Sequence, residues 1–403
     1  MLQAELLKNK KIKNCRLCNS SKFIDIFSIG DMYINDFPPT TDLKGRNGKC
    51  PLDLILCEFC ELYQLRHTAP QELMYKRHYW YKSGINQTIK NDLKEISRIA
   101  LDIVKIEQSN VVLDIGANDG TLLKYFDNSA VRVGCEPATN LINDLKSNCE
   151  FLINEFWDSK HYKNLSLPKA KIITAIGMFY DMEDPNQFIK DAVEVLDSNG
   201  VFIAQLMTLK PMLETNDLGN ICHEHLEYYT YSSLKYLFEN NGLEIFKIEE
   251  NQINGGSYRI FARHFDKGSI EWDENISQDD VMNFKKRIDK NKLLCLEYIK
   301  LKLFEGKKIY VYGASTKGNT ILQYYGLSSE HILGAADKNE EKWGSYTLTD
   351  IPIVSEQEAR ENADIFLVLP YGFINEFVER EKSWLEAGGE FIVPLPIFRT
   401  IGE

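Results

Sequence analysis

The chain has 403 residues, of which 44% are hydrophobic and 26% charged, and its net charge is −12. This composition is typical of a soluble globular protein with two or three domains. The acidic balance argues against nucleic acid as the main partner, no apolar run reaches the ~18 residues that span a membrane, and the N-terminus lacks a signal-peptide core, so we expect a cytoplasmic protein.

Residues 1–70 contain two C-x-x-C pairs, Cys15 with Cys18 and Cys57 with Cys60. Four thiolates can close a tetrahedral site, which suits structural zinc and leaves no open position for chemistry. Iron at the same thiolates, Cys50 as a rival ligand and unrelated buried cysteines are the alternatives. We expect the segment between the pairs to consist of loops tied together by the metal.

The stretch 75–96 is rich in aromatic and hydrogen-bonding residues and continues into a helix that ends near Val104. Tyr79, Trp80 and Tyr81 are consecutive, so they cannot all face one core. Tyr79 and Tyr81 are therefore expected to line a pocket or an interface, with plain packing as the alternative.

The sequence VVLDIGANDGTLL, residues 111–123, reads as a buried strand, a glycine turn and a helix start at Asp119. Gly116 allows a sharp turn and Gly120 a close approach to a ligand, while Glu136 ends the next strand, where a carboxylate can bind ribose hydroxyls. The stretch resembles the first motif of class I S-adenosylmethionine (AdoMet) methyltransferases, and another nucleotide-binding α/β turn is the alternative. The expected AdoMet-binding residues here are Asp114, Gly116, Asn118, Gly120 and Glu136.

Strands and helices alternate from residue 108 to about 264, which predicts a mostly parallel sheet. The expected strands are 111–115, 131–135, 150–153, 171–176, 200–206, 243–248 and 257–264, and the expected helices are 119–126, 138–147, 185–196 and 232–241. Two successive final strands predict a closing antiparallel pair. The loop after the fourth strand lies where α/β sheets bind ligands, so Gly177 and Met178 are expected at the cofactor, with Phe179 and Tyr180 as further candidates.

The sequence NICHEHLEYYT places Glu224 between His223 and His225, after the fifth strand and before a helix capped by Thr230 or Ser232. Three interpretations compete. The three residues bind a metal, they form a polar loop whose side chains are hydrogen-bonded within the protein, or they form a general acid/base cluster. We favour the acid/base cluster.

Residues 277–305 predict one long helix that starts at Ser277, and the strand–helix pattern then restarts at residue 307. The turn Gly313–Gly318 is suited to phosphate, so Lys317 is expected to meet the diphosphate of a substrate. A second dinucleotide site using Asp337, or a turn with no ligand, are the alternatives. Tyr371 is expected to face the substrate.

The paired cysteines, Y-x-Y-x-S-G, the AdoMet motif, H-E-H-L-x-Y-Y, N-G-G-S-x-R and Y-G-A-S-T-K-G together resemble the AdoMet-dependent sugar C-methyltransferases, which act on nucleotide-linked 4-keto-6-deoxysugars. The resemblance covers nearly the whole chain. It implies that His225 is the base beside the keto group, with Glu224 next to it. We expect His223, Tyr79, Tyr81 and Asn254 to shape the pocket. Relatives often have tyrosine where this chain has Cys222, and N-V-x-x-H where it has Gly177 and Asp181. The expected substrate-binding residues are Cys222, Asn254, Arg259, Lys317 and Tyr371.

We therefore predict an α/β protein: a zinc-binding N-terminal domain (1–70), a class I methyltransferase Rossmann-like core (71–270), and a connector helix with a second Rossmann-like, substrate-anchoring domain (271–403). The substrate is expected between core and C-terminal domain. The predicted reaction is methyl transfer from AdoMet to a carbon next to the ketone of a nucleotide-linked deoxysugar. The alternatives are O-methylation of such a sugar and a non-catalytic AdoMet- or nucleotide-sugar-binding protein. The oligomeric state stays open, with a monomer expected.

Overall fold

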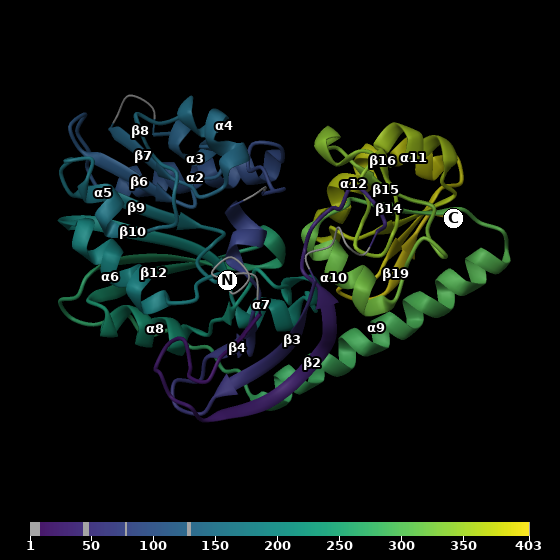
Figure 1. Ribbon diagram of the computed structural model, residues 1–403, viewed down its shortest axis with the longest axis horizontal. Coiled ribbons are helices and arrows are strands. Elements are labelled where there is room, and N and C mark those ends of the chain that lie inside the picture. Colours follow the sequence, from purple (N-terminus) through teal and green to yellow (C-terminus); the bar gives the residue numbers. More distant parts are fainter. Residues whose placement is uncertain (1–8, 43–47, 77–78, 127–129, 403) are drawn as a thin grey trace. The chain divides into compact units, whose positions relative to one another are not determined.

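The computed structural model describes residues 9–42, 48–76, 79–126 and 130–402, which form two compact units (Figure 1). The first unit contains the chain up to Ile24, Ile55–Pro211 and Leu226–Asn275. The second contains Asp25–Leu54, Met212–His225 and Ile276 onward. The H-E-H residues thus belong to the same unit as the C-terminal part of the chain.

The first unit is built on a seven-stranded sheet with the order β12-β13-β10-β9-β6-β7-β8. Its strands are β6 (Val111–Ile115), β7 (Val131–Cys135), β8 (Phe151–Ile153), β9 (Ala170–Ile176), β10 (Leu196–Met207), β12 (Leu243–Asn251) and β13 (Ser257–His264). Strand β13 pairs antiparallel with both β10 and β12, whereas the neighbouring pairs from β8 to β10 are parallel. The predicted closing antiparallel pair is confirmed, and the sheet is that of a class I methyltransferase.

Helices cover both faces of this sheet because successive strand residues point to opposite sides. Val112 and Ile172 pack on one face with α2, and Leu113 and Ile173 on the other with α6 and α8. The helical segments of the unit are η2 (Glu72–Lys76), α2 (Gln87–Ile103), α3 (Thr121–Lys124), η4 (Thr139–Leu141), α4 (Ile142–Lys146), α5 (Ser159–Lys163), α6 (Pro185–Val195), α8 (Tyr231–Asn240) and η6 (Ile253–Gly255), with α7 (Leu209–Glu214) crossing the unit boundary. Thr230 caps α8, and it is one of the two residues that we predicted as the cap.

The segment between the cysteine pairs was expected to be loops, and this prediction was wrong. It contains β2 (Phe23–Tyr33) and β3 (Lys49–Cys57). The buried side chains Cys50, Leu52 and Leu54 alternate along β3, a period of two that marks a half-buried strand. The remaining strands of the N-terminal part are β1 (Lys10–Lys11), β4 (Tyr63–Leu65) and β5 (His67–Thr68). Strand β4 pairs antiparallel with β11 (Glu227–Tyr228), which follows the H-E-H residues.

The second unit contains a six-stranded sheet with the order β16-β15-β14-β17-β18-β19, parallel except for β19. Its strands are β14 (Ile309–Tyr312), β15 (Gly334–Asp337), β16 (Ile353–Ser355), β17 (Ile365–Val368), β18 (Glu390–Val393) and β19 (Arg399–Ile401). Its helical segments are η5 (Leu218–Asn220), α9 (Gln278–Phe304), α10 (Thr316–Tyr325), η7 (Glu340–Lys342), α11 (Glu356–Asn362), η8 (Tyr371–Phe373), α12 (Ile374–Arg380) and α13 (Lys382–Glu386). The predicted long helix is α9, which Ser277 caps through Asp280 (Figure 1).

No helix among the described residues is long and apolar enough to cross a membrane.

Candidate active site and zinc centre

The two cysteine pairs meet in the first unit, where the sulfur atoms of Cys15, Cys18, Cys57 and Cys60 all lie within 4.8 Å of one another. Cys15 Sγ lies 3.6 Å from Cys60 Sγ, and Cys18 Sγ lies 3.4 Å from Cys57 Sγ. A tetrahedral zinc thiolate site requires sulfur atoms roughly 3.8 Å apart, so these four side chains fit zinc. Among the described residues, Cys50 belongs to no such cluster, and its proposal as a rival ligand is not supported.

Both cysteine pairs form the same backbone knuckle. The N–H of Asn19 donates to the carbonyl of Cys15, and the N–H of Glu61 donates to that of Cys57, four residues before it in each case. Asn19 (φ 61) and Glu61 (φ 57) are both left-handed. The two knuckles thus present their thiols in equivalent ways, as expected for a structural metal centre with no catalytic position.

The turn after β6 contains three left-handed residues, Gly116 (φ 72), Asn118 (φ 53) and Gly120 (φ 78). Glycine and asparagine adopt this conformation at the lowest cost. A Cβ on Gly116 would lie 2.8 Å from Cγ of Met178, so the turn closely approaches the loop after β9. Strands β6 and β9 are neighbours whose successors, β7 and β10, lie on opposite sides, and α/β sheets bind ligands at such a switch point.

Glu136 lies beside this turn at the end of β7 and is buried. Its Oε2 accepts the N–H of Asn118 at 2.9 Å, and its Oε1 accepts the N–H of Ala138 at 2.8 Å. Burial raises the pKa of Glu136, although these two hydrogen bonds act to lower it. The carboxylate and the glycine cradle are therefore held together, and this arrangement fits the ribose and backbone contacts of a nucleoside cofactor such as AdoMet.

Two details of the predicted cofactor site need correction. A Cβ on Gly120 would meet Cβ of Asn148 at 2.7 Å, so this glycine permits close packing within the protein where we expected close approach to a ligand. Phe179 is fully buried and stacks on Tyr229 with ring centroids 6.0 Å apart, so it belongs to the core and cannot flank the cofactor.

Asp114 is the buried acid of the motif, one strand position before Ile115. Thr174 Oγ1 donates to Asp114 Oδ1 at 2.7 Å. Burial raises the pKa of Asp114 to about 7 despite this bond, and the charges of Glu136 and Asp119 act in the same direction. Asp114 thus connects β6 to β9 near the turn that follows β6.

The aromatic segment that contains Tyr79 and Tyr81 is tied to the cofactor turn. Asn118 Nδ2 donates to the carbonyl of Tyr81 at 3.0 Å, and its Oδ1 accepts the N–H of Ser83 at 2.9 Å. Asn140 makes an equivalent pair of bonds with the backbone of Tyr79. The structure therefore brings together the predicted residues Tyr79, Tyr81, Gly116, Asn118, Glu136, Gly177 and Met178.

In the second unit, Nδ1 of His225 lies 2.8 Å from the carbonyl oxygen of Asn220. A carbonyl only accepts, so Nδ1 carries the proton and Nε2 carries the lone pair. Burial, followed by the positive charge of Lys317, lowers the pKa of His225 to about 3. The imidazole is thus neutral near pH 7, with Nε2 as its basic atom.

The other H-E-H residues are held by the segment 25–54. Nε2 of His223 lies 2.9 Å from the carbonyl oxygen of Cys50. Asn35 Nδ2 donates to the Glu224 carboxylate, 3.0 Å from each oxygen. Cys222 is buried beside them. These contacts favour a supporting role for His223, while Glu224 and Cys222 remain predicted site residues.

The predicted phosphate turn carries Lys317 in the first turn of α10. Lys317 Nζ lies 3.2 Å from Asp217 Oδ2, and the hydroxyl of Tyr371 donates to Asp217 Oδ1. Tyr371 is largely buried by this arrangement. The two predicted substrate residues therefore share one partner, Asp217, that the sequence analysis did not identify.

The alternative of a second dinucleotide site is not supported by the side chains around Asp337. Lys342 Nζ lies 3.0 Å from Asp337 Oδ2 and donates to the carbonyl of Ala314 at 2.7 Å. A Cβ on Gly313 would lie 2.4 Å from Cγ of Pro370. Asp337 is therefore paired with a lysine of the protein itself, which does not favour its alternative role as a ribose acceptor.

The N-G-G-S-x-R motif folds as a strained turn followed by a buried arginine. Asn254 (φ 55), Gly255 (φ 92) and Gly256 (φ 120) all have positive φ. Arg259 is 2% exposed, and its guanidinium binds Asp92 at 2.7 Å and Gln205 at 2.9 Å. These bonds favour a structural role for Arg259, in place of the predicted substrate contact.

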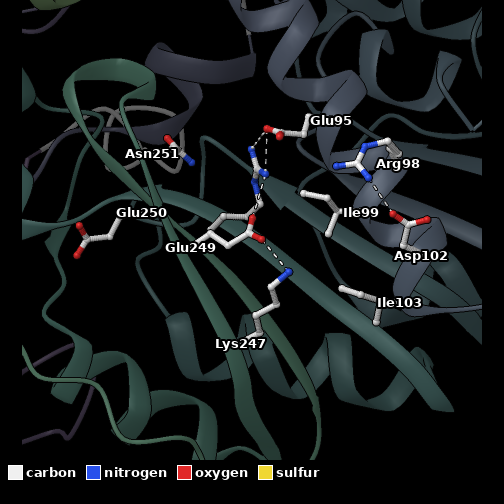
Figure 2. Close-up of a pocket in the computed structure, with 10 residues that line it drawn as sticks. Glu95, Arg98, Ile99, Asp102, Ile103, Lys247, Glu249, Glu250 and Asn251 are labelled. Atoms are coloured by element: carbon white, nitrogen blue, oxygen red, sulfur yellow. Dashed lines mark hydrogen bonds and ion pairs between the residues drawn. The ribbon is translucent and has the colours of Figure 1, made fainter.

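Arg259 also borders a pocket of about 530 Å³ on the first unit (Figure 2). The pocket is lined by Glu95, Arg98, Ile99, Asp102, Ile103, Lys247, Glu249, Glu250, Asn251 and Arg259. Arg98 pairs with Asp102 at 2.9 Å, and Lys247 with Glu249 at 2.7 Å (Figure 2). Apart from Arg259, no predicted site residue lines it.

Sequence reasoning missed Asn35, Asp217 and Asn220. Asn35 and Asp217 lie in loops without periodicity, and their partners are 189 and 154 residues away in the chain. Asn220 lies only five residues before its partner His225. Its contact is made by the backbone carbonyl, which a residue of any type would supply, so residue type gave no signal. Only the clustering of polar residues around H-E-H signalled this region.

Three family models match the chain. A zinc binding domain covers residues 15–75, a methyltransferase domain covers 87–248, and a C-methyltransferase C-terminal domain covers 252–396. The chain is also 26% identical to the C-methyltransferase NovU of Streptomyces niveus over 410 residues, which is 97% of each protein.

Solved methyltransferase structures resemble parts of the chain. One is magnesium protoporphyrin IX methyltransferase of Synechocystis PCC 6803 with bound SAM (10% identity, TM-score 0.33, 44% of this chain and 79% of that one). Another is an S-adenosylmethionine-dependent methyltransferase from Clostridium acetobutylicum (10% identity, TM-score 0.33, 45% of this chain and 92% of that one). The family assignment does not rest on these likenesses.

The three consecutive matches agree with the four-thiolate centre and with the class I sheet. They favour an enzyme over the alternative of a non-catalytic binding protein. The chain is therefore an AdoMet-dependent methyltransferase, and along nearly its whole length it is similar to C-methyltransferases with an N-terminal zinc-binding domain.

Proposed function

We propose that the enzyme methylates a carbon next to the ketone of a nucleotide-linked deoxysugar, with His225 as general base. The observation that carries the proposal is the bond from His225 Nδ1 to the carbonyl of Asn220, which leaves Nε2 as the basic atom of a buried, neutral imidazole. The C-methyltransferase family match supplies the reaction class.

Carbon next to a ketone is acidic enough for an imidazole to begin removing its proton when the resulting enolate is stabilised. His225 Nε2 would accept that proton, and AdoMet would supply the electrophilic methyl group that the carbanion takes. A pKa of about 3 makes the imidazole a weak base. The charge of Lys317 contributes to that low value, so an anionic group bound at Lys317 would make His225 more basic.

Lys317 is the residue that we assign to the diphosphate of the nucleotide, and a sugar diphosphate supplies such an anion. Its side chain is 30% exposed and is presented by the first turn of α10. For AdoMet we assign Gly116, Asn118, Glu136 and Met178, with Tyr79 and Tyr81 lining the pocket. Glu224, fixed by Asn35, is assigned to a hydrogen bond with the sugar or with a histidine.

The test is incubation of the full chain with methyl-¹³C AdoMet and a panel of nucleotide-linked ketosugars, followed by product NMR. A methyl signal bonded to carbon is expected, whereas a methoxy signal would establish the O-methylation alternative. His225→Asn should abolish turnover while calorimetry shows AdoMet binding intact. His331→Asn is the matched control, because His331 lies in the same unit next to Ser328 and should leave turnover unchanged. Near-wild-type turnover by His225→Asn would contradict the assignment of the base.

A further inference from the structure

Asp217 joins three elements of the second unit through one buried carboxylate. It precedes η5 and is 5% exposed. Its Oδ2 accepts a hydrogen bond from Lys317 on α10 at 3.2 Å, and its Oδ1 accepts one from the hydroxyl of Tyr371, where η8 begins. A buried carboxylate with both oxygens bound holds its donors in fixed positions.

The same short turn contacts His225. The N–H of Asn220 donates to the carbonyl of Asp217 at 3.1 Å, and the carbonyl of Asn220 accepts from His225 Nδ1 at 2.8 Å. A Cβ on Gly219 would lie 3.0 Å from Cβ of Lys317, so the turn and the start of α10 are in direct contact. One short turn therefore links Lys317 to the carbonyl that orients the imidazole.

We propose that Asp217 is a positioning residue that couples the binding of an anion at Lys317 to the imidazole of His225. This proposal rests on the proposed function, because it takes the diphosphate of the substrate as the natural anion and His225 as the base. Lys317 binds Asp217 before the anion arrives, and the anion then shares the ammonium with the carboxylate. The η5 turn passes the change to Asn220 and the imidazole.

The charges around this turn are consistent with the coupling. The positive charge of Lys317 opposes protonation of His225. Asp217 partly neutralises Lys317, and burial keeps these charges effective at short range. The neighbouring Glu224 is held by Asn35, and His223 by the carbonyl of Cys50.

The experiment follows the ring nitrogen signals of His225 by NMR in the full chain at neutral pH, with inorganic pyrophosphate as the probe. The signals are assigned by their loss in His225→Asn. In the wild type, pyrophosphate should move the His225 signals, and Lys317→Met should abolish both the shift and the binding. In Asp217→Asn, the anion no longer shares the ammonium with a carboxylate, so pyrophosphate should bind at least as tightly as in the wild type, while the His225 shift should fall by about half or more.

Asp289 provides a matched control in the same unit. It accepts a hydrogen bond from Lys285 at 2.6 Å and another from the hydroxyl of Tyr324, so it repeats the Tyr–Asp–Lys arrangement with different partners. Asp289→Asn should respond to pyrophosphate as the wild type does. If Asp217→Asn does not fold, Tyr371→Phe removes only one bond to the carboxylate and should reduce the shift.

A wild-type His225 signal that pyrophosphate binding does not move would overturn the proposal. A full wild-type shift in folded Asp217→Asn, or binding that survives in Lys317→Met, would do the same. The NMR measurement needs no turnover, so these outcomes are distinct from a failure of the ketosugar panel, which would count against the proposed function instead.

Discussion

Gly116→Ala tests whether the turn after β6 is the AdoMet cradle. The substitution places an alanine at φ 72, a left-handed conformation that costs roughly 1–2 kcal/mol for a residue with a Cβ. It also places that Cβ 2.8 Å from Cγ of Met178, where ordinary contact begins at 3.4 Å. Met178, which we assign to the AdoMet site, must then move, so AdoMet should bind at least about tenfold more weakly, which corresponds to ~1.4 kcal/mol.

Gly306→Ala separates the two effects, because Gly306 has φ 78 and nothing lies within 4 Å of its added Cβ. Gly306→Ala should lose stability from the backbone strain alone, Gly116→Ala should lose at least as much, and only Gly116→Ala should lose AdoMet affinity in calorimetry. Trimming the clashing side chain in Gly116→Ala/Met178→Ala should restore part of the affinity. If Gly116→Ala binds AdoMet as tightly as Gly306→Ala does, the cradle lies elsewhere.

Two further predictions concern the metal and the buried acid. Chelation of zinc, or Cys57→Ser, should lower the unfolding temperature and reduce the metal content from about one zinc per chain, since a closed thiolate site contributes to folding. The control variant Cys50→Ser should keep the zinc. Equal loss of zinc in both variants would refute the four-cysteine centre. The pKa of Asp114, raised to about 7 by burial, means that the folded state binds this proton more tightly than the unfolded state does. Its contribution to stability is present at low pH and is lost as the pH rises through 7, by about 1.4 kcal/mol between pH 6 and 8. Denaturant titrations should show a flatter pH dependence for Asp114→Asn, and an unchanged slope would contradict the shifted pKa.

The sequence by itself determined the strands of the methyltransferase sheet and the identity of the metal ligands. The strands Val111–Ile115 and Val131–Cys135 match their predicted bounds because each is a short segment rich in β-branched residues that ends in a turn or a polar residue. The cysteine pairs were equally clear, since C-x-x-C spacing is a local constraint. The turn at Gly116, which the structure shows to be left-handed, followed from residue type alone.

The tertiary structure alone decided what surrounds these elements. Gly120 faces Asn148, Arg259 binds Asp92, and Asp217 receives Lys317 and Tyr371, all through contacts between residues distant in the chain. Local periodicity and residue type carry no information about such partners. A buried polar group must find a hydrogen-bond partner, but which one it finds depends on how the strands and helices pack.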